Sequence, residues 1–315
     1  MSETFLNYKN PIAFFNPKSA GGKTAKKFDM IKAALGRAAF GFRNVTYIET
    51  KKDRSENNEV IRNALETKQY DLIITIGGDG TLSSIVNGMF ILPPELHLPI
   101  MPVPFGSGNS VLRDFDIHTI DDVMMHYQNA AAPKDFDLLL CENEKGFRYY
   151  CINLLGMGFI SDVVVEVLKF HKKFGAFSYV VGIMSALNRF RAYKVTMEIG
   201  SGENKNVVTA DRGQFLTLSN TQYSGGGIQI APQAKYNDGL MDVVLLHDLS
   251  KFAFLQGFSK TFKGKHVGRK GCEYIQTDRI RITAEPEMML MPDGELEGQT
   301  PITVSVIPKA VKIVV

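Results

Sequence analysis

The sequence predicts an α/β plus β protein: an N-terminal open α/β domain, then a mainly antiparallel β-sandwich-like domain with a few helices. Two features indicate the first domain. Short apolar segments alternate with segments of helical periodicity, and three of the apolar segments end in glycine-rich loops. In the C-terminal part, strand-like segments follow one another with few helices between them, which is typical of antiparallel sheets. We expect the domains to span residues 1–134 and 135–315, with the last strands able to pack back near the first domain.

The first domain is expected to repeat a strand and a helix several times. Residues 70–76 (YDLIITI) are short and almost continuously apolar, as expected for a parallel strand that is covered on both faces. Residues 53–69 are polar, with Ile61 and Leu65 on the apolar side of a helix. The expected strands are 11–17, 44–50, 70–76 and 98–104, and the expected helices are 21–39, 53–69 and 81–90.

The second domain is expected to be mostly strands. Its strand-like segments are separated by turns. The expected strands are 146–156, 192–199, 212–220, 240–247, 278–285 and 301–308, and the expected helices are 161–173, 177–190 and 249–266.

The composition is that of a globular protein, with 44% hydrophobic residues, 22% charged residues and a net charge of +3. This charge is small and no nucleic-acid-binding motif accompanies it, so we expect no nucleic acid partner. Cys141, Cys151 and Cys272 lack the CxxC spacing of zinc sites, which indicates reduced thiols. The first residues do not resemble a signal peptide, and no uncharged apolar segment reaches the ~18 residues of a membrane span. We expect a cytoplasmic protein with peripheral membrane contact, and a homodimer is compatible with the sequence.

Residues 74–89 (ITIGGDGTLSSIVNGM) connect a buried strand to a helix through three glycines. Glycine permits positive φ angles and lets main-chain N–H groups approach phosphate oxygens, and the N-terminus of the next helix adds a favourable dipole. Asp79 is unexpected in such a loop because it would repel a bare phosphate. A shared Mg²⁺ or an acceptor hydroxyl would explain Asp79. The alternative is a tight turn in which Asp79 caps the helix.

Two further loops contain parts of known phosphate-binding patterns. Residues 17–24 (PKSAGGKT) end like a Walker A loop, but Pro17 occupies the position of its first glycine. Residues 106–111 (GSGNSV) begin like a dinucleotide-binding loop, but Val111 replaces the third glycine. Because all three loops follow strands of the same expected sheet, one nucleotide could contact all of them. The two lysines of the first loop either bind this nucleotide or are solvated.

Six motifs together resemble the diacylglycerol kinase catalytic-domain family, which includes sphingosine kinases, ceramide kinases and bacterial soluble lipid kinases. They are NPKSAGGK (16–23), GGDGT (77–81), PFGSGNS (104–110), YNDGLMDV (236–243), FKGKH (262–266) and PDGE (292–295). The resemblance covers almost the whole chain. NAD kinases and phosphofructokinases share a loop similar to GGDGT, so the C-terminal motifs are what favour lipid kinases.

The resemblance implies an ATP site and a magnesium site. Asp238 matches a magnesium ligand of bacterial members, together with the main-chain carbonyls of Lys235 and Leu240. One carboxylate and two carbonyl oxygens suit a hard cation such as Mg²⁺, although YNDG alone is also a hairpin-turn sequence. The residues that match ATP-binding positions of the family are Asn16, Thr50, Gly77, Gly78, Asp79, Gly80, Thr81, Leu82, Ser83 and Ser107.

Residues 288–295 (MMLMPDGE) place two carboxylates after an apolar segment. Phosphoryl transfer requires a base near the acceptor hydroxyl, while the remaining catalysis is positioning and charge neutralisation. By the resemblance, Glu295 is the first candidate for this base and Asp293 the second. Asp79 either belongs to the metal–water network or is a further candidate for this base. Taken alone, the DG pair is more often a turn.

The resemblance leaves the lipid head group open. Residues 158–163 (GFISDV) are similar to the sphingosine kinase segment in which an aspartate pairs with the amino group of the substrate, so Asp162 could select sphingoid bases. The alternative is that Ser161 or Asp162 caps a helix. Several large side chains nearby either line an acyl pocket or belong to the core. They are Phe159, Phe170, Phe174, Phe177, Tyr179 and Met184.

We therefore expect an ATP- and Mg²⁺-dependent lipid kinase that transfers the γ-phosphate to a hydroxyl of a diacylglycerol-like or sphingoid lipid. Its substrate would lie in a membrane surface, and segments 169–174 and 259–270 mix basic and aromatic residues that suit anionic lipids. Two alternatives remain. One is an NAD-kinase-like enzyme acting on a soluble acceptor, and the other is a nucleotide- or lipid-binding regulator without turnover.

Overall fold

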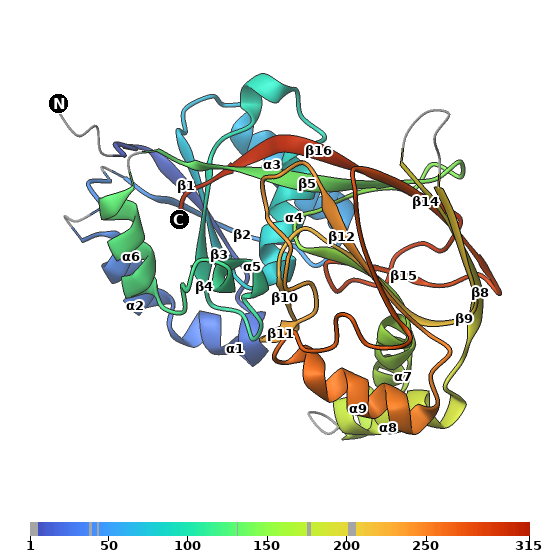
Figure 1. Ribbon diagram of the computed structural model, residues 1–315. Helices are drawn as coiled ribbons and strands as arrows, with labels where there is room; N and C mark the ends of the chain where they lie inside the picture. The colour runs from blue at the N-terminus through green and yellow to red at the C-terminus, as the bar shows by residue number, and fades with distance from the viewer. Residues whose placement is uncertain (1–5, 38–39, 43, 131, 175–177, 201–205) are drawn as a thin grey trace. The chain divides into compact units, whose positions relative to one another are not determined.

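The structure is a computed structural model that describes residues 6–37, 40–42, 44–130, 132–174, 178–200 and 206–315, without the side chains of residues 170–180. The chain folds into two compact units (Figure 1). The first unit contains residues 1–138, 225–227 and 308–315, and the second contains residues 139–224 and 228–307. Two strands, β5 (Lys134–Glu142) and β16 (Ile302–Ile313), contribute residues to both units.

The first unit is built on a parallel sheet with the strand order β4-β3-β1-β2. Its strands are β1 (Pro11–Phe15), β2 (Thr46–Glu49), β3 (Leu72–Gly77) and β4 (Ile100–Pro104). Ile313 of β16 pairs in parallel with Ile100 of β4. All six residues of β3 are buried, as expected for a central strand that is covered on both faces. The parallel order places the loops after β1, β3 and β4 at one edge of the sheet.

Helices cover both faces of this sheet, with α2 and α6 on one face and α3 and α4 on the other (Figure 1). The helices are α1 (Ser19–Lys26), α2 (Phe28–Leu35), α3 (Arg54–Leu65), α4 (Asp79–Met89), α5 (Ser110–Arg113) and α6 (Ile120–Asn129), with a 3₁₀ turn η1 (Pro94–Leu96). The single helix expected over residues 21–39 is two helices separated at Lys27. Gly21 and Gly22 have φ angles of 68° and 84°, so the start of α1 is a left-handed turn.

The second unit consists mainly of antiparallel strands. The 14-residue strand β9 organises it, because β9 pairs with β12 on one edge and with β8 and then β7 on the other. The strands are β6 (Arg148–Cys151), β7 (Leu154–Gly158), β8 (Tyr193–Ile199), β9 (Asn206–Ser219), β10 (Tyr223–Ser224), β11 (Ile228–Gln229), β12 (Met241–His247), β13 (Cys272–Thr277), β14 (Arg279–Glu285) and β15 (Leu290–Pro292). The predicted fold class is confirmed.

Two apolar clusters stabilise the second unit. The larger lies among the strands and includes Leu155, Val195 and Val243, whereas the smaller lies under the helices and includes Phe159 and Phe254. The helices are α7 (Phe159–Phe174), α8 (Ser178–Arg189) and α9 (Lys251–Thr261). In the described part of the chain, no helix combines the length and the apolarity that a bilayer span requires.

Candidate functional site

Three predicted nucleotide-binding loops are tied together at the carboxyl edge of the first unit's sheet. The Asn16 N–H donates to the carbonyl of Ile76 at 3.1 Å, which joins the loop after β1 to the end of β3. Thr50, which directly follows the neighbouring strand β2, donates its N–H to the carbonyl of Phe15 at 2.9 Å. The loop after β4 joins the same edge through Phe105, whose N–H donates to the carbonyl of Gly77 at 2.8 Å. The structure therefore gathers the predicted positions at one edge.

Glycine is required where two of these loops cross. A Cβ added to Gly106 would lie 2.2 Å from the Cα of Gly78, and one added to Gly78 would lie 2.8 Å from the Cα of Gly106. Such distances are too short for any side chain, so the two backbones can approach only as glycines. Within this arrangement Thr81, Leu82 and Ser83 are buried in the first turn of α4. Leu82 can contribute to nucleotide binding only through its main chain.

Asp79 connects the two glycine-rich loops. It is the first residue of α4, while Gly78 occupies the N-cap position, so the alternative in which Asp79 caps this helix is wrong. Its Oδ1 accepts the N–H of Ser110 at 2.6 Å and that of Val111 at 3.4 Å. Burial raises the pKa of Asp79, while hydrogen bonds from residues 110 and 111 and the charge of Arg113 oppose this rise. Asp79 is thus a partly buried carboxylate at the predicted phosphate site.

One segment of this edge is not part of any predicted motif. Gly225, Gly226 and Gly227 lie far along the chain but belong to the first unit, and all three have positive φ angles. A Cβ on Gly226 would lie 3.5 Å from the carbonyl oxygen of Ser107, so the triple-glycine segment contacts the PFGSGNS loop. The three consecutive glycines were a signal for close backbone approach, but their sequence separation from the other loops concealed their location.

In the second unit, the two carboxylates of the PDGE motif have different surroundings. Asp293 is only 9% exposed, and its carboxylate accepts the N–H groups of Ile152, Asn153 and Leu154 at 2.9 to 3.1 Å. It therefore holds the turn between β6 and β7. Glu295 is exposed, and its N–H donates to the carbonyl of Pro292 at 2.9 Å. Glu295 has the more accessible carboxylate, which favours it as the predicted base.

The predicted magnesium loop presents oxygen atoms to solvent. Asp238 is exposed, and its Oδ1 accepts the N–H of Leu240 at 3.1 Å in a tight turn. The charge of Asp238 contributes to the raised pKa of Asp242, which arises first from burial. Among the described residues, Oδ2 of the fully buried Asp242 has no hydrogen-bond partner. An orphaned carboxylate oxygen on a residue that is influenced by the charge of Asp238 fits a cation bound by oxygen ligands.

This fit depends on main-chain oxygens. In the described part of the chain, no group of three or more His, Cys, Asp or Glu side chains is placed to hold a metal ion. A magnesium ion here would therefore need the carbonyl oxygens of Lys235 and Leu240, which the resemblance also implied.

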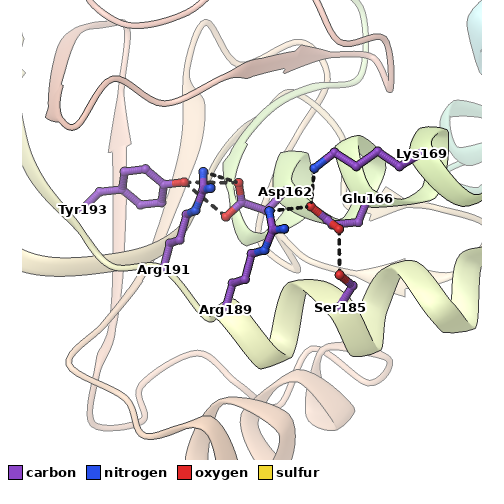
Figure 2. A network of polar contacts seen from close by, with 7 residues as sticks. All are labelled: Asp162, Glu166, Lys169, Ser185, Arg189, Arg191 and Tyr193. Atoms are coloured by element: carbon purple, nitrogen blue, oxygen red, sulfur yellow. Dashed lines mark hydrogen bonds and ion pairs between the residues drawn. The ribbon is translucent and has the colours of Figure 1, made fainter.

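Asp162 is paired with side chains of the protein. Tyr193 donates its hydroxyl to both carboxylate oxygens of Asp162, at 3.1 and 3.2 Å, and a guanidinium nitrogen of Arg191 lies 4.0 Å away (Figure 2). Burial raises the pKa of Asp162, and these two partners oppose the rise. Helix α7 begins at Phe159, so Asp162 lies inside it, and Ser161 donates its hydroxyl to the carbonyl of Gly158. The alternative that Ser161 or Asp162 caps the helix is wrong.

The large side chains that were predicted either to line an acyl pocket or to belong to the core differ in their surroundings. The ring of Phe159 packs against that of Phe254 with a centroid distance of 4.8 Å, so Phe159 belongs to the core under the helices. Met184 on α8 is exposed. The remaining members of the predicted set, Phe170, Phe174, Phe177 and Tyr179, have side chains outside the described part.

Glu166 joins α7 to α8. Its side chain is 5% exposed and lies 2.7 Å from the Lys169 ammonium and 3.0 Å from the Arg189 guanidinium (Figure 2). Ser185 on α8 donates its hydroxyl to the other oxygen at 2.7 Å. The hydrogen bond from Lys169 is the main reason that the pKa of Glu166 is lowered. Lys169 lies in one of the two segments predicted to contact a membrane surface. Its ammonium group is thus already paired with Glu166.

We expect Glu166→Gln to lower the free energy of unfolding by about 1–3 kcal/mol, because it removes a buried charged acceptor of three donors. A lowered pKa means that this stabilisation is present above the ordinary carboxylate pKa and is lost as the pH falls through the lower folded value. The difference between wild type and variant should thus be full at neutral pH and shrink below about pH 4. Denaturant unfolding at several pH values measures it.

The matched control for this variant is Glu144→Gln. Glu144 pairs with Arg281 at 3.0 Å, but its side chain is 85% exposed. We expect the control to change stability by less than about 0.5 kcal/mol. Equal effects of the two substitutions would show that the Glu166 network does not stabilise the helix pair.

Comparisons with known proteins agree with this geometry. A diacylglycerol kinase catalytic domain model matches residues 10–140, and a model of the YegS C-terminal NAD kinase beta sandwich-like domain matches residues 154–315. The chain is 26% identical over 239 residues to a diacylglycerol kinase of Bacillus subtilis (strain 168), covering 74% of each protein. It is 25% identical over 314 residues to a diacylglycerol kinase of Mycobacterium tuberculosis (strain ATCC 25618 / H37Rv), covering 96% of this chain and 93% of the relative.

A solved structure shares the fold. The crystal structure of a diacylglycerol kinase from Bacillus anthracis str. Sterne superposes with a TM-score of 0.69 at 18% identity, covering 98% of this chain and 97% of the other. The two matched domain models together span most of the sequence, and the family expected from the six motifs is confirmed. The chain belongs to the diacylglycerol kinase catalytic-domain family of lipid kinases.

Proposed function

We propose that the protein transfers the γ-phosphate of ATP to the hydroxyl of a diacylglycerol-like glycerolipid. The observation that carries this proposal is the set of three loops tied together after β1, β3 and β4, with Asp79 partly buried and bonded between two of them. Main-chain N–H groups and the N-terminus of α4 can bind phosphates at that edge. Asp79 adds a fixed negative charge, which suits a site that also handles a cation or a hydroxyl.

Glu295 would accept the proton of the lipid hydroxyl as the phosphoryl group is transferred. Its exposure supports this role, whereas the three N–H donors on Asp293 support a role in positioning the PDGE loop. Mg²⁺ bound with ATP would supply charge neutralisation for the phosphates. Asp238 and the carbonyls of Lys235 and Leu240 would hold a magnesium ion in the second unit.

The surroundings of Asp162 favour a neutral glycerolipid over a sphingoid base. An amino group of the substrate would have to compete with Tyr193 and Arg191 for the carboxylate. Burial also raises the pKa of Tyr193 to about 12, so its hydroxyl keeps its proton and donates at neutral pH. Two curated relatives carry the name diacylglycerol kinase, which supports the same acceptor class.

Radioactive transfer from [γ-³²P]ATP in mixed micelles tests this proposal. We expect strong labelling of diacylglycerol and weak or no labelling of sphingosine, ceramide, monoacylglycerol and phosphatidylglycerol in parallel reactions. Labelling of sphingosine alone would overturn the glycerolipid acceptor and would make Asp162 an amine ligand. Labelling of NAD without lipid would overturn lipid phosphorylation in favour of a soluble acceptor. ATP binding without transfer to any acceptor would indicate a regulator.

A further inference from the structure

Helix α9 exposes a stripe of large apolar side chains. Phe252, Leu255 and Phe262 are 77%, 44% and 56% exposed. Together with Ser259 they are spaced three or four residues apart, so they share one side of the helix and its C-terminal end. An isolated exposed apolar residue needs no explanation, but three on one stripe indicate a binding surface.

The exposure is not a sign of a poorly packed helix, because another side of α9 is firmly anchored. Phe254 is fully buried, and its ring lies 4.8 Å from that of Phe159 and 5.0 Å from that of Phe190. Ser250 caps the helix by accepting the N–H of Ala253. The core requires only this side, so the outer stripe serves something outside the second unit's core.

The charge around the stripe is one-sided. Residues 249–272 contain no Asp or Glu. They contain six basic residues, which are Lys251, Lys260, Lys263, Lys265, Arg269 and Lys270. Apart from the half-buried Lys260, all of these are exposed. A segment that combines an apolar stripe with exposed cations and contains no acidic residue of its own complements a surface that is apolar inside and negatively charged outside.

We propose that the outer stripe of α9 and the basic segment after it form the docking surface for an anionic phospholipid bilayer. Phe252, Leu255 and Phe262 enter the boundary between head groups and acyl chains, and the following lysines contact the phosphates. This inference rests on the proposed function, since an enzyme that phosphorylates a glycerolipid must reach it in a membrane. It goes further by assigning the contact to α9, whereas Lys169 of α7 pairs with Glu166.

A tryptophan reporter tests this surface, because the chain contains no Trp. With Phe252→Trp, we expect the emission to shift to shorter wavelength on adding phosphatidylglycerol vesicles and to be quenched by brominated acyl chains. Phosphatidylcholine vesicles should produce much less change, and raised salt should weaken the response. The matched control is Val207→Trp, because Val207 on β9 is also exposed, at 57%. No shift in the first variant, or equal shifts in both, would overturn the proposal.

Vesicle sedimentation of the protein provides a second readout. We expect Phe252→Ser combined with Phe262→Ser to reduce the vesicle-bound fraction by about tenfold or more, with Val207→Ser unchanged. Unchanged binding of the double variant would overturn the proposal. Conversion of a dimer to a monomer by the double variant, without loss of vesicle binding, would instead assign the stripe to a second copy of the chain.

A short-chain diacylglycerol below its aggregation limit separates the two proposals. The double variant should phosphorylate this dispersed acceptor at the wild-type rate and lose activity only on vesicles. Absence of transfer to the dispersed acceptor by wild type would overturn the proposed function while leaving the vesicle-binding result standing. Equal loss on both acceptors would show that the stripe supports catalysis itself and would overturn docking.

Discussion

Glu295→Gln is expected to reduce kcat by about 10²- to 10⁴-fold, which is the usual contribution of a general base. Glutamine has nearly the same shape but cannot accept the proton of the lipid hydroxyl. Because Glu295 is exposed and only its main chain holds the turn at Pro292, folding should be unaffected. ATP affinity should also be retained, since the predicted nucleotide loops lie in the first unit. Steady-state kinetics with diacylglycerol and ATP titration measure the two properties separately.

The matched control for this variant is Glu297→Gln, two residues further along the same segment. Its main-chain N–H donates to the carbonyl of Leu290, so the control keeps the backbone contact while removing a neighbouring charge. The control should keep turnover within about threefold of wild type, because solvent around the exposed Glu295 screens the field of a neighbouring charge. Near-normal turnover of Glu295→Gln would refute the assignment of Glu295 as the base.

Asp79→Asn is expected to reduce turnover by about 10²-fold or more without unfolding the first unit. The asparagine Oδ1 can still accept the N–H groups of Ser110 and Val111, so the two glycine-rich loops should remain joined. The substitution removes the negative charge, and with it the predicted interaction of residue 79 with a cation or with the acceptor hydroxyl. We therefore expect the Mg²⁺ dependence of nucleotide binding to change together with kcat.

Two further substitutions distinguish the effect of losing the charge from the effect of losing the hydrogen bonds between the loops. Asp79→Ala also removes the acceptor, so it should lower the melting temperature where Asp79→Asn does not. Asp71→Asn is the control, because Asp71 likewise accepts two main-chain N–H groups, from Lys9 and Asn10, but precedes β3 instead of following it. Equal losses of activity at residues 71 and 79 would mean that Asp79 acts only by holding the backbone.

Much of the fold could be predicted because it depends on local patterns. The apolar segment before GGDGT forms β3, and the periodicity of residues 53–69 forms α3. Boundaries were less predictable. Helix α9 ends at Thr261 and not at residue 266, because the residues after it form turns. Strand β13 was missed because its polar residues face outward along an edge, where pairing with β12 supplies the order that its composition does not.

The candidate site was predictable to the extent that its motifs are local. The glycines of GGDGT indicated that a backbone or phosphate approaches closely, and the structure shows a close approach between Gly78 and Gly106. The roles of the carboxylates were not predictable, because they depend on partners distant in sequence. Asp293 binds N–H groups of residues about 140 positions away, and Asp162 on α7 binds Tyr193 on β8, which is 31 residues away. No local pattern encodes such contacts.

The return of residues 308–315 to the first unit affects how the protein is made on the ribosome. The N–H of Lys309 donates to Asp137 of β5. The N–H of Val314 donates to the carbonyl of Ile100, and Ile313 pairs with the same residue, so the end of the segment closes the edge of β4. Domains near the N-terminus usually fold first during translation. Here the unit that is translated first is completed last, and until then β4 presents an unpaired edge to other nascent chains. Chaperone dependence during synthesis should therefore be concentrated in the first unit.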